Sequence, residues 1–270
     1  MSTASAPIEI ATVALTVHDL SAVSAFYESG LGLSRFDAAG PIVRLGVGDR
    51  VLLELRQDRA ARRAARGEAG LFHTAFLMPD RPALARWLRH ALDSRLQLQG
   101  ASDHLVSEAI YLADPEGNGI EVYVDRPRSR WHAPDGTIRM ATDSLDLPGL
   151  LQDADAAWIG APQGTVVGHV HLEVGALAEA EAFYATRLGL PVMARYPGAA
   201  FFGAGGYHNH IAANVWNSCR ASPRQFPVTG LAELVLAVDA SERAAIQSRG
   251  GADQMVDPWN TPITLVTKPA

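Results

Sequence analysis

Ala25-Phe26-Tyr27-Glu28-Ser29-Gly30-Leu31-Gly32-Leu33 is a short motif that returns far along the chain as Ala182-Phe183-Tyr184-Ala185-Thr186-Arg187-Leu188-Gly189-Leu190. Each copy follows a strand-like run of alternating apolar residues, 13–17 and 170–174, at the same spacing. Repetition at a fixed spacing is typical of folds assembled from copies of one supersecondary unit. We therefore expect units that contain a strand, a helix ending near Leu-Gly-Leu, and further strands.

A second pair of segments also repeats. Gly70-Leu71-Phe72-His73 and Gly230-Leu231-Ala232-Glu233 each open a strand, and a helical stretch follows in both copies. Each copy then closes on a strand that carries Asp-Pro, at Asp114-Pro115 and Asp257-Pro258. The pattern predicts an α+β protein of four βαβββ modules, at about residues 8–56, 70–126, 166–218 and 229–268.

The arrangement of the modules follows from the need to cover both faces of each sheet. A lone βαβββ unit leaves one face open, so we expect pairs of modules to form half-open barrels of mixed sheet with a concave face for a ligand. The expected organisation is an N-terminal two-module domain (1–127), a linker (128–163) and a C-terminal two-module domain (164–270) whose last module is degenerate.

Composition excludes several classes of protein. The 270 residues are 48% hydrophobic and 19% charged, and the net charge of −6 comes with no basic run, so nucleic acid is not an expected partner. The single cysteine, Cys219, excludes an intrachain disulfide and a cysteine-based zinc site. The sequence shows neither a signal peptide nor an apolar run long enough to span a membrane, which favours a cytoplasmic protein.

The module pattern resembles the vicinal oxygen chelate superfamily of glyoxalases, bleomycin resistance proteins and extradiol dioxygenases, and the resemblance covers nearly the whole chain. It implies a metal site whose ligands come from the first and last strands of paired modules. The first-strand positions here are Thr12, His73, His169 and Glu233. The last-strand positions are Glu54, Glu121, His208 or His210, and Thr264.

Module two carries the most specific motif. His104, Tyr111, Asp114-Pro115-Glu116-Gly117 and Glu121 stand in the order and spacing of a sequence that resembles the extradiol dioxygenase signature, with Ser102 as one departure. The resemblance implies that Glu121 is a metal ligand, that Tyr111 hydrogen-bonds a substrate oxygen, and that His104 lines the pocket.

Module three carries the other half of the expected site. Gly168-His169 resembles the first-strand ligand motif, and Tyr207-His208-Asn209-His210 resembles the paired-histidine strand of the same enzymes, which implies that His210 is the acid–base catalyst. His171 lies two residues from His169, as His208 does from His210. Each alternative therefore shares a face with the preferred residue and stays open.

These positions predict one metal site with His73, Glu121 and His169 as ligands. Two imidazoles and one carboxylate suit Fe(II), with Mn(II) accepting the same set. In an apolar strand, His73 alone would more often be a buried core histidine. Module one lacks a first-strand ligand at Thr12 and module four ends in Thr264, a poor ligand, so we expect modules two and three to pair across the linker. That pairing requires the nearest ring nitrogens of His73 and His169 to lie within about 6 Å, since both must reach one metal.

The resemblance favours an extradiol ring-cleaving dioxygenase that acts on a catechol-type aromatic with O2. One alternative is a glyoxalase-like lyase or isomerase that uses Glu54, His73 and Glu121 with one further ligand. Another is a protein of the same fold that binds an aromatic or a drug without chemistry. A homodimer is compatible with the sequence but is not specified by it.

Overall fold

The computed structural model describes residues 6–268. The strands of the first two modules are β1 (Ile8–Val17), β2 (Ser34–Ala39), β3 (Ile42–Val47), β4 (Arg50–Gln57), β5 (Gly70–Leu77), β6 (Leu98–Asp103), β7 (Ser107–Ala113) and β8 (Gly119–Asp125). The later strands are β9 (Asp143–Ser144), β10 (Val166–Glu173), β11 (Val192–Tyr196), β12 (Ala199–Phe202), β13 (Ile211–Asn214), β14 (Gly230–Val238), β15 (Gln254–Val256) and β16 (Pro262–Thr267).

One helical segment follows the first strand of each module. The helices are α1 (Leu20–Gly30), α2 (Arg81–Asp93), the 3-10 turn η1 (Arg128–Arg130), α3 (Leu147–Gln152), α4 (Leu177–Glu181), its π-helical continuation η2 (Ala182–Arg187), and α5 (Ala240–Ser248). Asp19, Asp80 and Asp239 begin α1, α2 and α5, because each side chain accepts a backbone N–H three residues later. The element order confirms the four predicted modules, and the fourth is one strand short.

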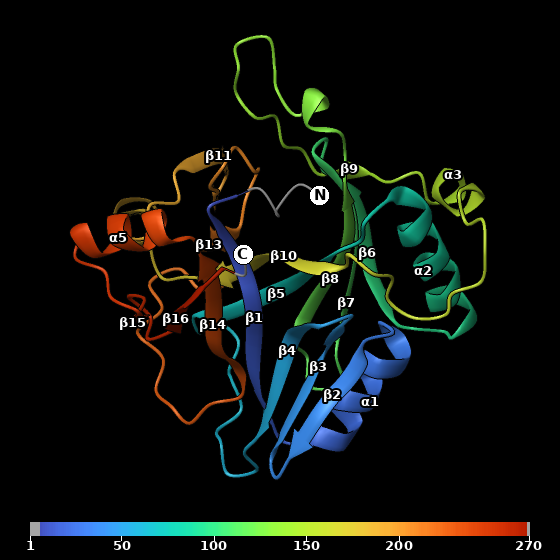
Figure 1. Ribbon diagram of the computed structural model, residues 1–270, viewed down its shortest axis with the longest axis horizontal. Helices are drawn as coiled ribbons and strands as arrows, with labels where there is room; N and C mark the ends of the chain where they lie inside the picture. Colours follow the sequence, from blue (N-terminus) through green and yellow to red (C-terminus); the bar gives the residue numbers. More distant parts are fainter. Residues whose placement is uncertain (1–5, 269–270) are drawn as a thin grey trace.

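The strands form two mixed sheets, as the predicted α+β fold requires. The seven-stranded sheet has the order β15-β16-β14-β1-β4-β3-β2, and the nine-stranded sheet has the order β11-β12-β13-β10-β5-β8-β7-β6-β9. Modules one and four therefore share one sheet through the antiparallel pair β1–β14, and modules two and three share the other through β5–β10. The predicted pairing of modules is confirmed, and Figure 1 shows the two central pairs crossing close to each other.

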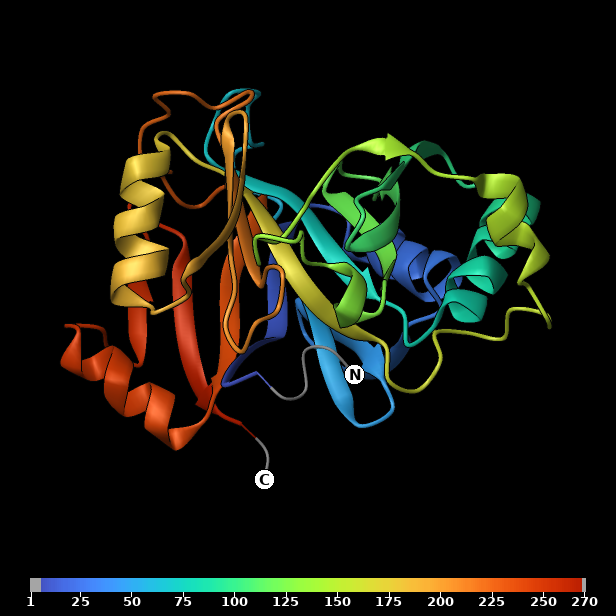
Figure 2. The ribbon, with the colours of Figure 1, turned by 90° about the horizontal axis from the view of Figure 1, so that it is seen from above.

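The main core lies between the sheets and beneath the helices. β1 contacts β10 across the two layers, and Leu15, Phe76 and Val170 are buried in the same cluster. Figure 2 shows α4, η2 and α5 on one side of the molecule and α1, α2 and α3 on the other. No helix of the described residues is long and apolar enough to cross a membrane.

The segment 128–163 runs between the two sequence halves. It contains η1, β9 and α3, and its Trp131 is fully buried. Figure 1 shows its first part projecting from the body between β8 and β9. Each sheet takes strands from both sequence halves. The division into an N-terminal and a C-terminal domain therefore stays a prediction.

Candidate metal centre

Three adjacent strands supply the candidate ligands. His73 lies on β5, Glu121 on β8 and His169 on β10, and the sheet order β10-β5-β8 places β5 in the middle. A bulge in β10 between Val167 and His169 contains Gly168, where a Cβ would lie 1.8 Å from the hydroxyl oxygen of Tyr123. Only glycine fits at this position, so the bulge that sets the direction of His169 depends on Gly168.

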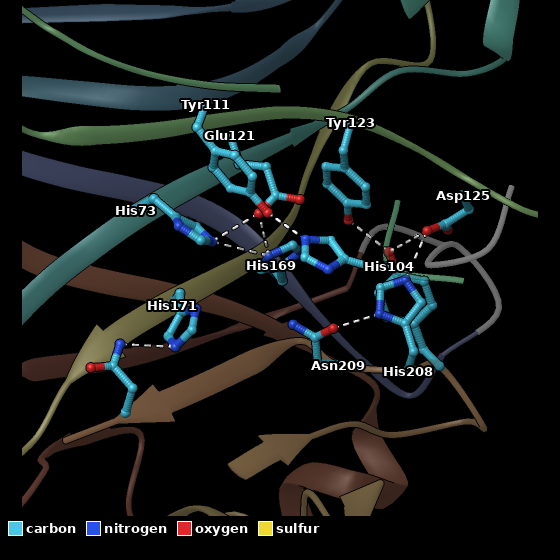
Figure 3. Close-up of polar contacts among 12 residues, drawn as sticks. His73, His104, Tyr111, Glu121, Tyr123, Asp125, His169, His171, His208 and Asn209 are labelled. Carbon is cyan, nitrogen blue, oxygen red and sulfur yellow. Dashed lines mark hydrogen bonds and ion pairs between the residues drawn. The ribbon is translucent and has the colours of Figure 1, made fainter. Parts of the chain in front are cut away.

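The three side chains converge on one point. His73 Nε2 lies 2.9 Å from Glu121 Oε2, and His169 Nε2 lies 3.4 Å from both of these atoms (Figure 3). Donor atoms about 2.1 Å from one ion and at right angles to each other lie about 3 Å apart, so this triangle has the size of one face of an octahedral site. The separation of the two imidazoles meets the limit set from the sequence.

Burial and charge prepare these groups for a cation. His73, Glu121 and His169 are 5%, 2% and 6% exposed. Burial would raise the pKa of Glu121, but the imidazoles of His169 and His73 outweigh it and hold the pKa well below its usual range. Burial lowers the pKa of His169. The carboxylate is therefore ionised and His169 is neutral at neutral pH, as metal binding requires.

The fourth possible ligand position is an alanine. β5 pairs with β8 so that Ala75, two residues after His73, lies opposite Glu121. β10 pairs with β13 in the same register, so that His171, two residues after His169, lies opposite Ala212. Ala212 thus occupies the place that corresponds to Glu121, and among the described residues the cluster has three ligands.

Tyr111 and His104 lie beside this cluster as a hydrogen-bonded pair. His104 Nδ1 donates to the carbonyl oxygen of Ala141 at 2.6 Å, because a carbonyl oxygen only accepts. In the neutral ring, Nε2 therefore accepts the Tyr111 hydroxyl at 2.5 Å. Burial, and then the negative charge of Glu121, raise the pKa of Tyr111 well above its usual value. Tyr111 thus keeps its proton, and His104 is positioned to receive it.

The two histidines that precede β13 differ in where they point. His208 lines the cavity, and its Nε2 lies 2.8 Å from Asp125 Oδ1 (Figure 3). His210 is fully buried outside the cavity lining, because its Nδ1 turns back to accept the amide of Ala204 at 3.2 Å. Of the two histidines left open by the sequence, the geometry therefore favours His208 rather than the preferred His210 as the residue that faces the cavity. His171, the other open alternative, lines the cavity together with His169.

Several residues of the site were missed from the sequence. Asp125 and Asn209 both hydrogen-bond His208, at 2.8 and 2.5 Å, and Tyr123 hydrogen-bonds Tyr207 at 2.7 Å beside them. The one available signal was the position of Asp125, four residues and two strand periods after Glu121. Its distance in space from His208 depends on the folding of modules two and three together.

The repeated tyrosines hold the Asp-Pro turns. The hydroxyl of Tyr27 in module one contacts Asp114 of module two at 3.5 Å, and Tyr184 of module three donates to Asp257 of module four at 2.7 Å. Asp114 also accepts the amides of Glu116 and Asn118, which begin the approach to β8. Both tyrosines are fully buried. Through the contact between Tyr27 and Asp114, module one anchors the turn that precedes the Glu121 strand of module two.

The equivalent position in the seven-stranded sheet holds an ion-pair cluster. Arg56 contacts Glu54 and Glu233 at 2.6 Å each, and Thr264 donates to Glu233 at 2.6 Å. Arg44 takes the second carboxylate oxygen of Glu54. Glu54 therefore belongs to a different sheet from His73 and Glu121, and the glyoxalase-like ligand set that contains Glu54 is wrong.

The fold and the site define a class. Residues 9–122 match the model of the Glyoxalase/Bleomycin resistance protein/Dioxygenase superfamily, and the chain belongs to this superfamily. Its sequence is 40% identical over 227 residues to a protein of Bacillus subtilis named catechol-2,3-dioxygenase, across 80% of this chain and 78% of that protein.

Solved structures support the fold alone. A candidate dioxygenase from Bacillus subtilis superposes with a TM-score of 0.65 at 16% identity, covering 97% of this chain and 86% of that chain. Glyoxalase I from Zea mays superposes with a TM-score of 0.59 at 14% identity, covering 96% and 92%. Both similarities extend over nearly the whole chain, so the arrangement of both sheets is common to these proteins.

His210 makes the fold sensitive to acid. Burial, and then the nearby imidazole of His208, lower its pKa from 6.5 to about 3. Below about pH 6.5 the unfolded chain takes up a proton that the folded chain refuses, so stability falls by about 1.4 kcal/mol per pH unit until about pH 3. We expect the free energy of unfolding of His210→Asn, measured in urea, to fall by about 2 kcal/mol less than that of the wild type between pH 6.5 and pH 4.5. Equal losses in the two proteins would contradict this assignment.

Proposed function

We propose that this chain is an extradiol ring-cleaving dioxygenase, which opens a catechol-type ring with O2 at a metal held by His73, Glu121 and His169. The observation that carries the proposal is the set of three ligands, with Ala212 in the fourth position, beside the Tyr111–His104 pair. A site with three protein ligands on one face leaves room for a chelating substrate and O2. The relative named catechol-2,3-dioxygenase supports the same reaction.

The donor set fits Fe(II) or Mn(II). Both ions accept two imidazoles and a carboxylate, and the three donor atoms lie within 4.8 Å of one another. When bound, such a metal lowers the pKa of a catechol hydroxyl and brings the substrate close to O2. The absence of cysteine from the cluster argues against a site dedicated to a thiolate-preferring metal.

Tyr111 and His104 can donate and accept a proton on one side of the cavity. The Tyr111 phenol can donate to a substrate oxygen beside Glu121, or pass its proton to His104 Nε2. The Ala141 carbonyl fixes the tautomer of His104, because it holds the proton of the ring on Nδ1. This pair can therefore accept the proton that a catechol hydroxyl loses on binding.

His208 is the proposed acid–base residue on the other side. Asp125 only accepts as a carboxylate, so His208 Nε2 carries a proton toward it. The other ring nitrogen of His208, Nδ1, faces the side-chain oxygen of Asn209 at the cavity wall, and that oxygen only accepts. The amide of Asn209 can turn to accept from or donate to Nδ1, so His208 can hold or release a second proton there.

The test of this function is oxygen uptake by the reloaded enzyme. Protein freed of metal and loaded with Fe(II) or Mn(II) under anaerobic conditions should consume one O2 per catechol when air is admitted, with a product that absorbs in the near ultraviolet or visible. We expect His208→Gln to lower kcat by about 100-fold, while His210→Asn stays active. If neither metal supports O2 uptake with any catechol, the proposed function is wrong.

A further inference from the structure

The cavity above the metal centre has a volume of about 250 Å³. Among the described residues that line it, Glu121 is the only carboxylate, and none is a lysine or an arginine. The lining also includes the small or neutral side chains of Ser102, Ser107, Met140 and Thr142. The cavity lining therefore offers no lysine or arginine as a permanent counter-ion to an anionic substituent.

Aromatic rings form a continuous wall from the metal ligands to the mouth. The ring centroids of His73 and Phe72 are 5.2 Å apart, and those of Phe72 and Trp216 are 5.6 Å apart. His171 lies between Phe201 and Trp216, at 6.1 and 5.5 Å. These separations are typical of packed aromatic pairs, so the wall presents ring faces and edges to a bound aromatic.

The outer end of the wall is held in place. Trp216 is 46% exposed at the mouth, yet its Nε1 donates to the carbonyl oxygen of Pro197 at 2.8 Å. Tyr196, 42% exposed, lines the same end of the cavity. An exposed indole that is oriented by a hydrogen bond is a preformed surface for an apolar group that enters from solvent.

We propose that this site selects uncharged catechols with an apolar or aromatic ring substituent and rejects catechols that carry a carboxylate; this inference rests on the proposed function. An apolar substituent gains contact with Phe72 and Trp216 as it leaves water. A carboxylate loses its hydration at this wall without gaining a lysine or arginine partner. Both effects favour the neutral substrate.

The test compares dihydroxybenzoate with dihydroxybenzamide, which has nearly the same shape and no charge. We expect kcat/KM for the amide to exceed that for the acid by about 100-fold. Anaerobic calorimetry should likewise show a lower Kd for the amide than for the acid. Phenylcatechol should exceed catechol by about 10-fold. Equal values for the acid and the amide, with catechol turned over, would overturn the inference alone. No turnover of any catechol would instead overturn the proposed function.

Two pairs of variants locate the selectivity. Trp216→Ala should remove the roughly 10-fold advantage of phenylcatechol over catechol, whereas Trp158→Ala, which removes an indole that stacks on His90 away from the cavity, should keep it.

Thr142→Arg adds a cation at the cavity wall and should narrow the gap in kcat/KM between acid and amide by about 10-fold, whereas the neutral Thr142→Met should not. If Thr142→Met narrows the gap as much, charge is not the cause of the discrimination.

Discussion

Glu121→Gln should purify as a folded protein that no longer retains metal. The substitution keeps the shape of the side chain but removes the negative charge that two buried imidazoles face at 2.9 and 3.4 Å. His73→Ala removes a donor atom outright. We expect the affinity for Fe(II) or Mn(II) to fall by more than about 100-fold in both variants, since even the partners of metal ligands are worth up to about that factor. Elemental analysis and calorimetry measure the loss.

The chain supplies its own control for this experiment. Glu54 occupies in the seven-stranded sheet the place that Glu121 occupies in the nine-stranded sheet, because Ala14 lies opposite Glu54 as Ala75 lies opposite Glu121. Glu54→Gln removes an equivalent carboxylate from an ion-pair cluster and should leave metal retention intact. Full metal content in Glu121→Gln, or its loss in Glu54→Gln, would show that the ligand assignment is wrong.

A break in the chain between Ala156 and Ala157 should abolish metal binding in both fragments. The first fragment keeps His73 and Glu121, and the second keeps His169, so neither holds the three ligands. The break also separates both partners of β1–β14 and of β5–β10, which leaves unpaired strand edges and exposed core in each fragment.

Mixing the two fragments provides the control for that break. We expect neither fragment alone to unfold cooperatively, and co-expression to restore both a cooperative transition and metal binding. Circular dichroism during urea unfolding and elemental analysis follow the two properties. A single fragment that folds and keeps the metal would show that each half is an independent domain, as the division at residues 128–163 would have it.

Much of the fold could be predicted because its signals are local. The repeated Phe-Tyr and Leu-Gly-Leu segments mark the helix ends of modules one and three, and alternation marks the first strands. Thr12 and Thr264 stand at ligand positions where the family resemblance would place a metal ligand, and their presence there predicted that modules two and three pair. This inference succeeded because the two sheets share one register, so equivalent positions in the sequence are equivalent in space.

The rest of the site depends on contacts between distant segments. Spacing puts His208 and His210 on one face, but the loop before β13 turns His210 toward its own backbone and His208 toward Asp125. The tether from His104 to Ala141 joins residues 37 apart, and nothing in either local sequence indicates it. Tertiary packing determines these contacts, and the periodicity of the sequence does not predict them.

The two sheets show how one register supports different chemistry. In one sheet the ligand positions carry His73, Glu121 and His169, and the buried carboxylate faces imidazoles. In the other, Arg56 lies between Glu54 and Glu233 and supplies permanently the positive charge that a metal would bring. One sheet can therefore bind a cation, and the other has its carboxylates already paired.

The most direct measurement is the fate of labelled oxygen. The Fe(II)- or Mn(II)-loaded protein is given catechol and ¹⁸O-labelled O2 in unlabelled water, and the ring-opened product is analysed by mass spectrometry. The proposed dioxygenase places both atoms of one O2 molecule in the product, and Glu121→Gln yields no labelled product. A product that contains no labelled oxygen, or an unopened ring, would contradict the assignment of ring cleavage to the site formed by His73, Glu121 and His169.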